Sequence, residues 1–214
     1  MPNRTPLQAV FFDWDCTLLD SYHADSRAYA AMFDSLGVPW SAIELKKHYA
    51  PDWHRVYRAA ALPKSRWAEA DRLWRRFYQR EEPRLQRGAR RVLVNLAARY
   101  RLGLVTGGST WRVRAQLRSL ALTSLFETRV YVEDATRRKP HPAPLLLALR
   151  RMDCPPDACI YVGDTPDDVF MARRAGVPVI GVLGHSPVPE KLRAARPDTL
   201  IHTLAELSKC LKVR

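Results

Sequence analysis

Two pairs of aspartates have the residue type and the spacing for metal-dependent chemistry. Asp13 and Asp15 stand two residues apart, so on an extended chain both side chains lean to the same side. Asp164 and Asp168 stand four residues apart, which makes them neighbours on a helix. Carboxylates this close repel each other unless a cation or a proton lies between them. Because carboxylate oxygens are the hard ligands that Mg²⁺ prefers, the two pairs indicate a magnesium site, provided that the fold brings them together.

Short apolar runs rich in strand-forming residues precede these polar groups. A buried strand is predicted over 9–12, and further strands are predicted over 102–105, 129–132, 159–162, 178–183 and 199–202. Helical segments separate them, and these are 92–99, 110–120, 142–152, a helix that ends at 175, and 204–211. Alternation of strands and helices predicts an α/β fold with a Rossmann-like parallel sheet, covered by helices on both faces.

Ligands of such sheets bind outside the carboxyl ends of the strands. The two aspartate pairs follow the first and fourth predicted strands. Thr106 ends the second, and Lys139 lies just past the third. We therefore expect the four carboxylates, a hydroxyl and an ammonium group to meet at one edge of the sheet.

The segment after the first strand has a different pattern. From about Tyr22 to Glu82 the chain is predicted to be helical, in pieces over 24–36, 43–49, 52–61 and 64–80. In the last piece apolar residues recur every three or four positions, which indicates one buried helix face. We predict an α/β core of residues 1–20 and 84–214, interrupted by an all-α cap of residues 21–83.

Four motifs in the expected order resemble those of the haloacid dehalogenase superfamily of phosphatases, and the match covers the whole chain. They are D-x-D-x-T at 13–17, an apolar strand ending in Thr106, the Lys139-Pro140 pair, and G-D-x-x-x-D at 163–168. The helical insert resembles the small cap of the phosphoglycolate phosphatase and β-phosphoglucomutase branch of this superfamily.

The resemblance implies a role for each motif residue. Asp13 is expected to be the nucleophile that forms an aspartyl-phosphate, and Asp15 the acid and base. Thr106 and Lys139 are expected to hold the phosphoryl oxygens. The expected cofactor is Mg²⁺. Its expected ligands are Asp13, Asp15 through its backbone carbonyl, Asp164, and Asp168, which could instead orient Lys139.

Further contacts with the substrate, a small phosphorylated metabolite, are predicted from the motifs and from the cap. They are assigned to Thr17, Gly107, Lys139, Arg55 and His48. One departure from the family pattern is Cys16, which stands where glycine is usual. Its side chain is either tolerated packing or a redox-sensitive thiol beside the nucleophile.

Composition adds a question about charge. The 214 residues carry 35 Lys and Arg against 22 Asp and Glu, a net charge of +13. Nine arginines and no acid fall between Arg84 and Arg118, many of them on helices predicted to flank the sheet. The first interpretation is an ordinary solvated basic surface. The second is that the positive charge steers anionic substrates towards the site. Because no nucleic-acid-binding motif accompanies the charge, nucleic acid is an unlikely partner.

The remaining expectations concern the setting of the protein. The four cysteines show no paired metal-site spacing and are expected to be reduced thiols. No apolar run approaches the length of a membrane span, and no secretory segment is evident, so we expect a cytoplasmic monomer or homodimer.

The sequence thus predicts a Mg²⁺-dependent phosphatase. Three alternatives remain at this stage. One is a sugar-phosphate mutase of the same superfamily, which returns the phosphoryl group instead of giving it to water. The second is a phosphoryl-accepting signalling module, and the third is a basic nucleic-acid-binding protein with a vestigial site.

Overall fold

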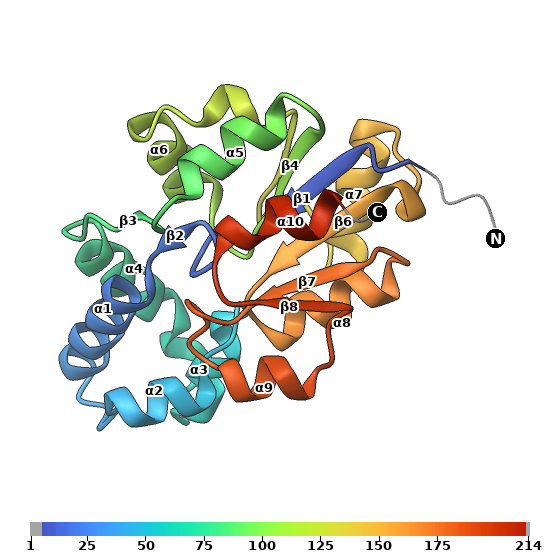
Figure 1. Ribbon diagram of the computed structural model, residues 1–214. Coiled ribbons are helices and arrows are strands. Elements are labelled where there is room, and N and C mark those ends of the chain that lie inside the picture. Colours follow the sequence, from blue (N-terminus) through green and yellow to red (C-terminus); the bar gives the residue numbers. More distant parts are fainter. Residues whose placement is uncertain (1–5, 213–214) are drawn as a thin grey trace.

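The apolar run Ala9–Phe12 forms β1, a central strand of a six-stranded parallel sheet. In the computed structural model, which describes residues 6–212, the strand order is β5-β4-β1-β6-β7-β8 (Figure 1). The other five strands are β4 (Arg101–Val105), β5 (Thr128–Val130), β6 (Cys159–Gly163), β7 (Val179–Val182) and β8 (Thr199–Ile201). All neighbouring pairs are parallel, so the six carboxyl ends lie at one edge, and the predicted fold class is confirmed.

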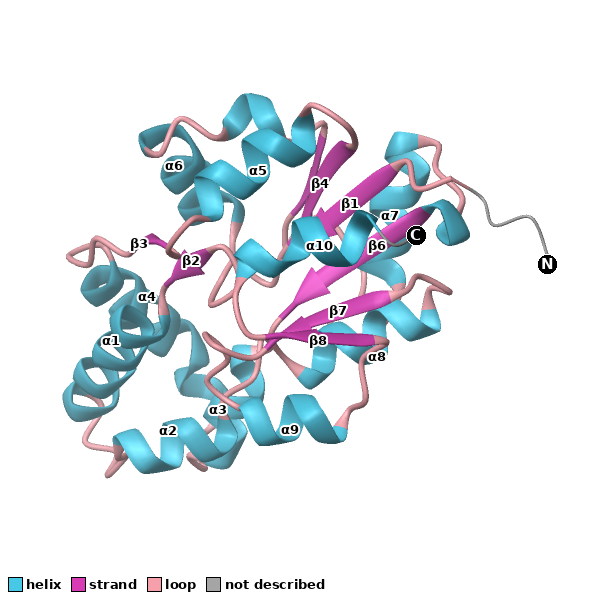
Figure 2. Ribbon diagram, in the orientation of Figure 1, coloured by secondary structure: helices cyan, strands magenta, loops and turns pink. Residues whose placement is uncertain are grey.

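Successive side chains of β1 enter two different apolar cores, as the alternation of a strand requires. Val10 and Phe12 pack with α5 (Ala89–Ala97), α6 (Thr110–Ser119) and α10 (Leu207–Lys212). Ala9 and Phe11 pack with α7 (Ala143–Met152), α8 (Pro166–Arg174) and α9 (Pro189–Ala194). Figure 2 shows the helices around the strands. A sheet buried on both faces in this way explains the continuous apolar runs of its strands.

The cap is a group of four helices inserted between two very short strands, β2 (Leu19–Asp20) and β3 (Arg84–Leu85). Its helices are α1 (Tyr22–Ser35), α2 (Ala42–His48), α3 (Trp53–Ala59) and α4 (Trp67–Tyr78). They enclose an apolar core of their own, made of Tyr29, Met32, Phe33, Leu36, Leu45, Val56, Tyr57, Leu62 and Ala70. In Figure 1 this group lies beyond the carboxyl ends of the sheet.

Two features were not predicted. The antiparallel pairing of β2 with β3 joins the two ends of the insert, and only two residues of each strand take part, which is too short for a periodic signal. Helix α9 has six residues and starts with a proline in a proline-rich segment that resembles a loop. Single turns of 3₁₀ helix complete the elements: Lys64–Arg66, Thr123–Leu125, Pro156–Ala158 and Leu204–Glu206. In the described part of the chain, no helix has the length and apolar character needed to cross a membrane.

Candidate active site

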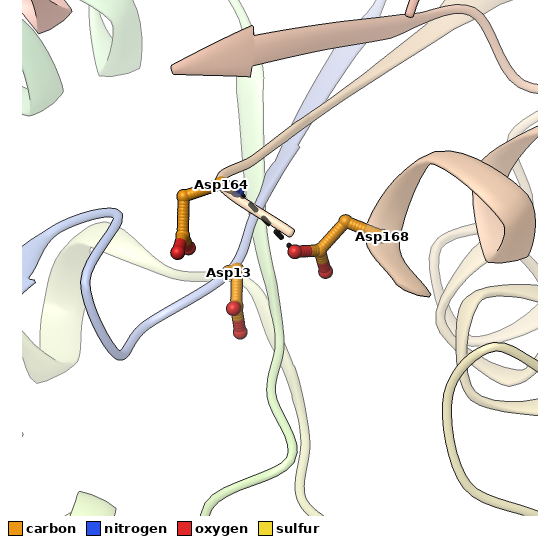
Figure 3. Close-up of side chains that lie close together, drawn as sticks. All are labelled: Asp13, Asp164 and Asp168. Carbon is orange, nitrogen blue, oxygen red and sulfur yellow. Dashed lines mark hydrogen bonds between the residues drawn. The ribbon is translucent and has the colours of Figure 1, made fainter. Parts of the chain in front are cut away.

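Three buried aspartates meet where β1 and β6 end. Asp13 follows β1 and Asp164 follows β6, and these two strands are paired in register, with Phe12 opposite Val162. Asp168 comes from the first turn of α8. One carboxylate oxygen of each lies within 4.8 Å of the others (Figure 3). The structure therefore brings together three of the four carboxylates predicted from the sequence.

The turn between β6 and α8 fixes the carboxylate of Asp168 by local contacts. Asp168 Oδ2 accepts hydrogen bonds from the Thr165 backbone nitrogen (3.1 Å), the Thr165 hydroxyl (2.7 Å) and the Asp164 nitrogen (3.3 Å). A Cβ atom at Gly163 would lie 2.5 Å from Asp168 Cγ, so only glycine lets the chain pass this close. This accounts for the G-D-x-x-x-D pattern in physical terms.

Lys139 lies between the carboxylates and neutralises part of their charge. Its Nζ is 2.8 Å from Asp13 Oδ1, 2.8 Å from Asp168 Oδ1 and 2.7 Å from the Tyr161 hydroxyl. Burial alone would lower the pKa of Lys139, but the ion pairs with Asp13 and Asp168 hold it above its usual value. The ammonium group stays charged. Asp168 is thus placed to orient Lys139, the second of the two roles considered for it.

The cluster also has the properties of a divalent cation site. Asp164 Oδ1 accepts a 2.5 Å hydrogen bond from the Thr17 hydroxyl, whereas Oδ2 is buried and has no hydrogen-bond partner among the described residues. Burial raises the pKa of Asp13 to about 7 and that of Asp164 well above its usual value, and the neighbouring carboxylates add to both shifts. An unpartnered, buried oxygen in an all-oxygen donor set fits Mg²⁺, which relieves this repulsion.

Asp15 is held apart from the cluster by an arginine. Arg112 Nη1 donates to Asp15 Oδ1 at 2.7 Å and Nη2 donates to Oδ2 at 2.6 Å, a bidentate pair. Burial acts to raise the pKa of Asp15, but the Arg112 charge outweighs it and holds the pKa below the usual value. The side chain of Asp15 is therefore not part of the three-carboxylate cluster, in agreement with a metal contact through its carbonyl alone.

Arg112 connects the core to the cap. Its Nη1 lies 3.3 Å from the hydroxyl of Tyr78, on the cap helix α4, and 3.4 Å from Gln116 Oε1. Gln116 also donates to the Tyr78 hydroxyl. A Cβ atom at Gly108 would lie 2.5 Å from Arg112 Nη2, so a side chain at that position would displace the guanidinium.

Thr106 and Gly107 begin the loop after β4. The Thr106 hydroxyl is buried and accepts a hydrogen bond from the Gly108 nitrogen at 2.9 Å, which curls the loop towards the end of the sheet. A Cβ atom at Gly107 would lie 3.1 Å from the carbonyl oxygen of Pro51 in the cap, so the glycine allows the cap to approach. This loop contributes Gly107 and Gly108 to the site.

A cavity of about 320 Å³ lies between core and cap, with Asp13, Asp15 and Asp164 in its lining. The two cap residues predicted to contact the substrate are not in that lining. Arg55 forms an ion pair with Asp167 of α8 at 2.7 Å, which fastens the cap to the core. His48 lies 3.5 Å from Glu44 on its own helix. Thr17 is likewise absent from the lining. Its hydroxyl donates a hydrogen bond to Asp164.

Cys16 adopts a left-handed backbone conformation, with a φ of 58°, which explains why glycine is usual at this position. Its Sγ is buried, 3.5 Å from the Tyr49 hydroxyl and 3.8 Å from the Ser21 hydroxyl. Burial raises the pKa of the thiol well above its usual value, so the thiol is protonated. These contacts favour the packing interpretation. Redox sensitivity of Cys16 stays a prediction.

Sequence reasoning missed Arg112 and Asp25. Arg112 stood in a run of nine arginines, of which the other eight are exposed. The available signal was its helical phase, since Arg112 stands next to the buried Val113 and one turn before Gln116. Asp25 lies on α1 in a segment without a motif, and only the folded cap places it in the cavity.

The comparisons with known proteins agree with this geometry. A family model described as haloacid dehalogenase-like hydrolase matches residues 10–182. A phosphoglycolate phosphatase of Photorhabdus laumondii is 26% identical over 94% of this chain and 91% of its own length.

Among solved structures, a haloacid dehalogenase-like hydrolase of Streptococcus pneumoniae has a TM-score of 0.83 at 25% identity, covering 95% of this chain and 98% of its own. A Thermotoga maritima protein assigned as a β-phosphoglucomutase has a TM-score of 0.75 at 24% identity, covering 97% and 99%. The resemblance inferred from the four motifs is confirmed. The chain belongs to the haloacid dehalogenase-like hydrolase family, and within it to the phosphatases.

Proposed function

We propose that this protein is a Mg²⁺-dependent phosphatase of a small phosphorylated metabolite and works through an aspartyl-phosphate intermediate. The observation that carries the proposal is the arrangement of Asp13 and Asp164 in the lining of a cavity, with the buried ammonium group of Lys139 2.8 Å from Asp13. A buried carboxylate next to an ammonium group and a cation site has the surroundings that an anionic nucleophile needs to approach an anionic phosphate.

The residues of the chain divide the reaction between them. The carboxylate of Asp13 attacks phosphorus and the bond between phosphorus and the leaving oxygen breaks. Asp15 gives a proton to that oxygen, for which it must first take up a proton and release the Arg112 pair that keeps it ionised. Asp15 then takes a proton from water, which attacks the aspartyl-phosphate and releases inorganic phosphate. Lys139 and the loop from Thr106 to Gly108 hold the phosphoryl oxygens, and Arg112 keeps the carboxylate of Asp15 in a fixed plane.

Asp13, Asp164 and the carbonyl of Asp15 would hold Mg²⁺, with Asp168 close behind them. When bound, the cation supplies neutralisation of the negative charge between the nucleophile and the phosphoryl group. The unpartnered Asp164 oxygen and the raised pKa values of Asp13 and Asp164 support this assignment. A cytoplasmic location, and a monomer or homodimer, stay predictions.

The test is a phosphate-release screen across phosphorylated alcohols and sugars, with Mg²⁺ and with a chelator in its place. We expect free phosphate from some of these esters, and loss of the activity when the chelator is added. Isomerised sugar phosphate without phosphate release would support the mutase alternative. Retardation of DNA or RNA that falls with salt, with no phosphate release, would support the nucleic-acid alternative and overturn the proposal.

A further inference from the structure

The part of the cavity wall that the cap contributes is largely aromatic. Six aromatic side chains line the cavity, five of them from the cap: Tyr29, Tyr49, Trp53, Tyr57 and Trp74, with Trp111 from α6. At about 320 Å³ the cavity has room for about ten water molecules of roughly 30 Å³ each. This is more than a phosphoryl group on a two-carbon alcohol would fill, so the cavity suits a larger leaving group.

Asp25 is the acidic group of this aromatic wall. Trp74 Nε1 donates a hydrogen bond to Asp25 Oδ1 at 3.1 Å, and within residues 6–212 no donor reaches Oδ2 and no cationic side chain lies within ion-pair distance. Burial is the main cause that raises the pKa of Asp25 to about 7, and the Asp15 charge adds to it, whereas the Arg112 charge and the Trp74 hydrogen bond lower it by less. The carboxylate therefore lies in the wall without an ion-pair partner of its own.

The cationic residues of the lining supply only part of that charge. The guanidinium of Arg112 lies 5.9 Å from the centre of the Trp74 ring and its charge acts on Asp25, but both of its terminal nitrogens are bound to Asp15. The remaining charged residues of the cap and the rim are exposed and include two of each sign: Arg72, Arg75, Asp71 and Glu133. The wall formed by the half-buried Asp25 and Trp74 and the buried Tyr29 is thus both acidic and aromatic.

We propose that the leaving group of the substrate is an alcohol that carries an ammonium group, and that this group binds against Asp25, Tyr29 and Trp74. The inference rests on the proposed phosphatase function. Aromatic faces attract organic cations, most strongly when water is excluded, and a carboxylate beside them adds an opposite charge that a bound cation stabilises. A leaving group with a carboxylate would instead face Asp25, and the described lining offers it no half-buried cation that is free of an ion pair.

Three phosphate esters, which differ in the charge of the leaving group, test whether this wall prefers a cation. Phosphocholine carries the cation, 3,3-dimethylbutyl phosphate has the same shape without the charge, and phosphoglycolate carries an anion. With the wild-type chain and Mg²⁺, we expect kcat/KM for phosphocholine to exceed that for the neutral ester by about tenfold or more, and phosphoglycolate to be the poorest of the three. Equal values for the charged and neutral esters, or a preference for phosphoglycolate, would overturn the inference.

The variant Asp25→Asn tests whether Asp25 causes the preference for phosphocholine. We expect the ratio of kcat/KM between phosphocholine and its neutral isostere to fall towards one, whereas Asp34→Asn, an exposed aspartate of the same helix, keeps the wild-type ratio. An unchanged ratio in Asp25→Asn would contradict the role of this residue. Because the readout is a ratio, an equal loss on both esters from poorer folding does not imitate the expected result.

A binding measurement separates this inference from the proposed function. Quenching of tryptophan fluorescence by choline and by 3,3-dimethylbutanol needs no turnover, and we expect tighter binding of choline. If p-nitrophenyl phosphate is hydrolysed but choline binds no better than its isostere, the phosphatase stands and the cationic leaving group is excluded. If no ester is hydrolysed, the proposed function fails, and choline binding still decides whether the wall recognises a cation.

Discussion

The two walls of the cavity are built on different principles. On the core wall, Asp13 lies in the lining and is held from outside it. Lys139 is 2.8 Å from both Asp13 and Asp168, and neither Lys139 nor Asp168 lines the cavity; all three are buried. On the cap wall, Asp25 is held by one indole nitrogen and lies among aromatic rings. The core wall is therefore a network in which each group depends on the next, whereas the cap wall is a surface whose members act separately.

This difference matches the two tasks of the site. A network that fixes charges before the substrate arrives stabilises the charge that develops during phosphoryl transfer. A surface of aromatic side chains selects the leaving group without taking part in bond breaking. Substitutions on the core wall should therefore change kcat for every ester, and substitutions on the cap wall should change the relative rates of different esters.

The largest expected effect follows from Asp13→Asn on the core wall. An amide cannot act as the nucleophile, so kcat should fall by about 10⁴-fold or more for all esters alike. Phosphate release at saturating substrate measures this loss. Retention of activity would show that another residue attacks phosphorus and would remove the functional difference between the two walls.

Asp15→Asn should lower kcat by about 10²- to 10⁴-fold, because an amide neither donates a proton to the leaving oxygen nor accepts one from water. The loss should be smallest for esters with acidic leaving groups such as p-nitrophenol, which depart without a proton. With such an ester, rapid quenching should trap the phosphorylated protein, since the second step still lacks its base. A loss that is equal for all leaving groups would contradict the acid role.

Arg112 belongs to both walls, and Arg112→Gln tests how firmly they are coupled. Removal of one partner of a half-buried bidentate pair leaves Asp15 uncompensated, and we expect the free energy of unfolding to fall by about 3 kcal/mol, together with kcat. Arg118→Gln, an exposed arginine of the same helix, is the matched control. Urea unfolding of both variants measures the difference, and equal stability of the two would show that the Arg112 pair contributes little.

A separate effect concerns the pH dependence of stability. The pKa of Asp25 is about 7 in the folded chain and 3.8 as its ordinary value, so the folded protein binds more protons between these values. Asp25 therefore costs no stability below about pH 4; its cost grows as pH rises from about 4 to about 7 and is constant above that. Asp25→Asn should match the wild type near pH 4 and be the more stable chain at pH 8, as thermal unfolding at both values would show. A constant difference would contradict the raised pKa.

The core wall could be predicted from the sequence because its residues follow strands. Each of the apolar runs that end at Asp13, Thr106 and Asp164 can be identified separately in the sequence. Parallel pairing of the strands then brings the three residues to one edge of the sheet. Arg55 and His48 could not be placed in this way. Their positions depend on how short helices pack. In the structure, Arg55 pairs with Asp167 and His48 lies beside Glu44.

Arg112 and Asp25 were missed for a related reason. Each is polar and stands in a helix, where the expected position is solvent exposure. Arg112 is buried because its guanidinium group pairs with the carboxylate of Asp15, which lies 97 residues away in the sequence. The position of Asp25 follows from the packing of α1 against α4. The contact of Asp25 has no local sequence signal, and the only one for Arg112 is its helical phase.

Trapping of the phosphorylated intermediate tests the central claim most directly. The wild-type chain, mixed with a substrate from the phosphate-release screen and quenched within one turnover, is treated with borohydride, which reduces an acyl phosphate to an alcohol, and is then analysed by peptide mass spectrometry. The mechanism predicts homoserine in place of aspartate at position 13 and at no other position. An unmodified Asp13 in a chain that releases phosphate, or modification of another carboxylate, would contradict it.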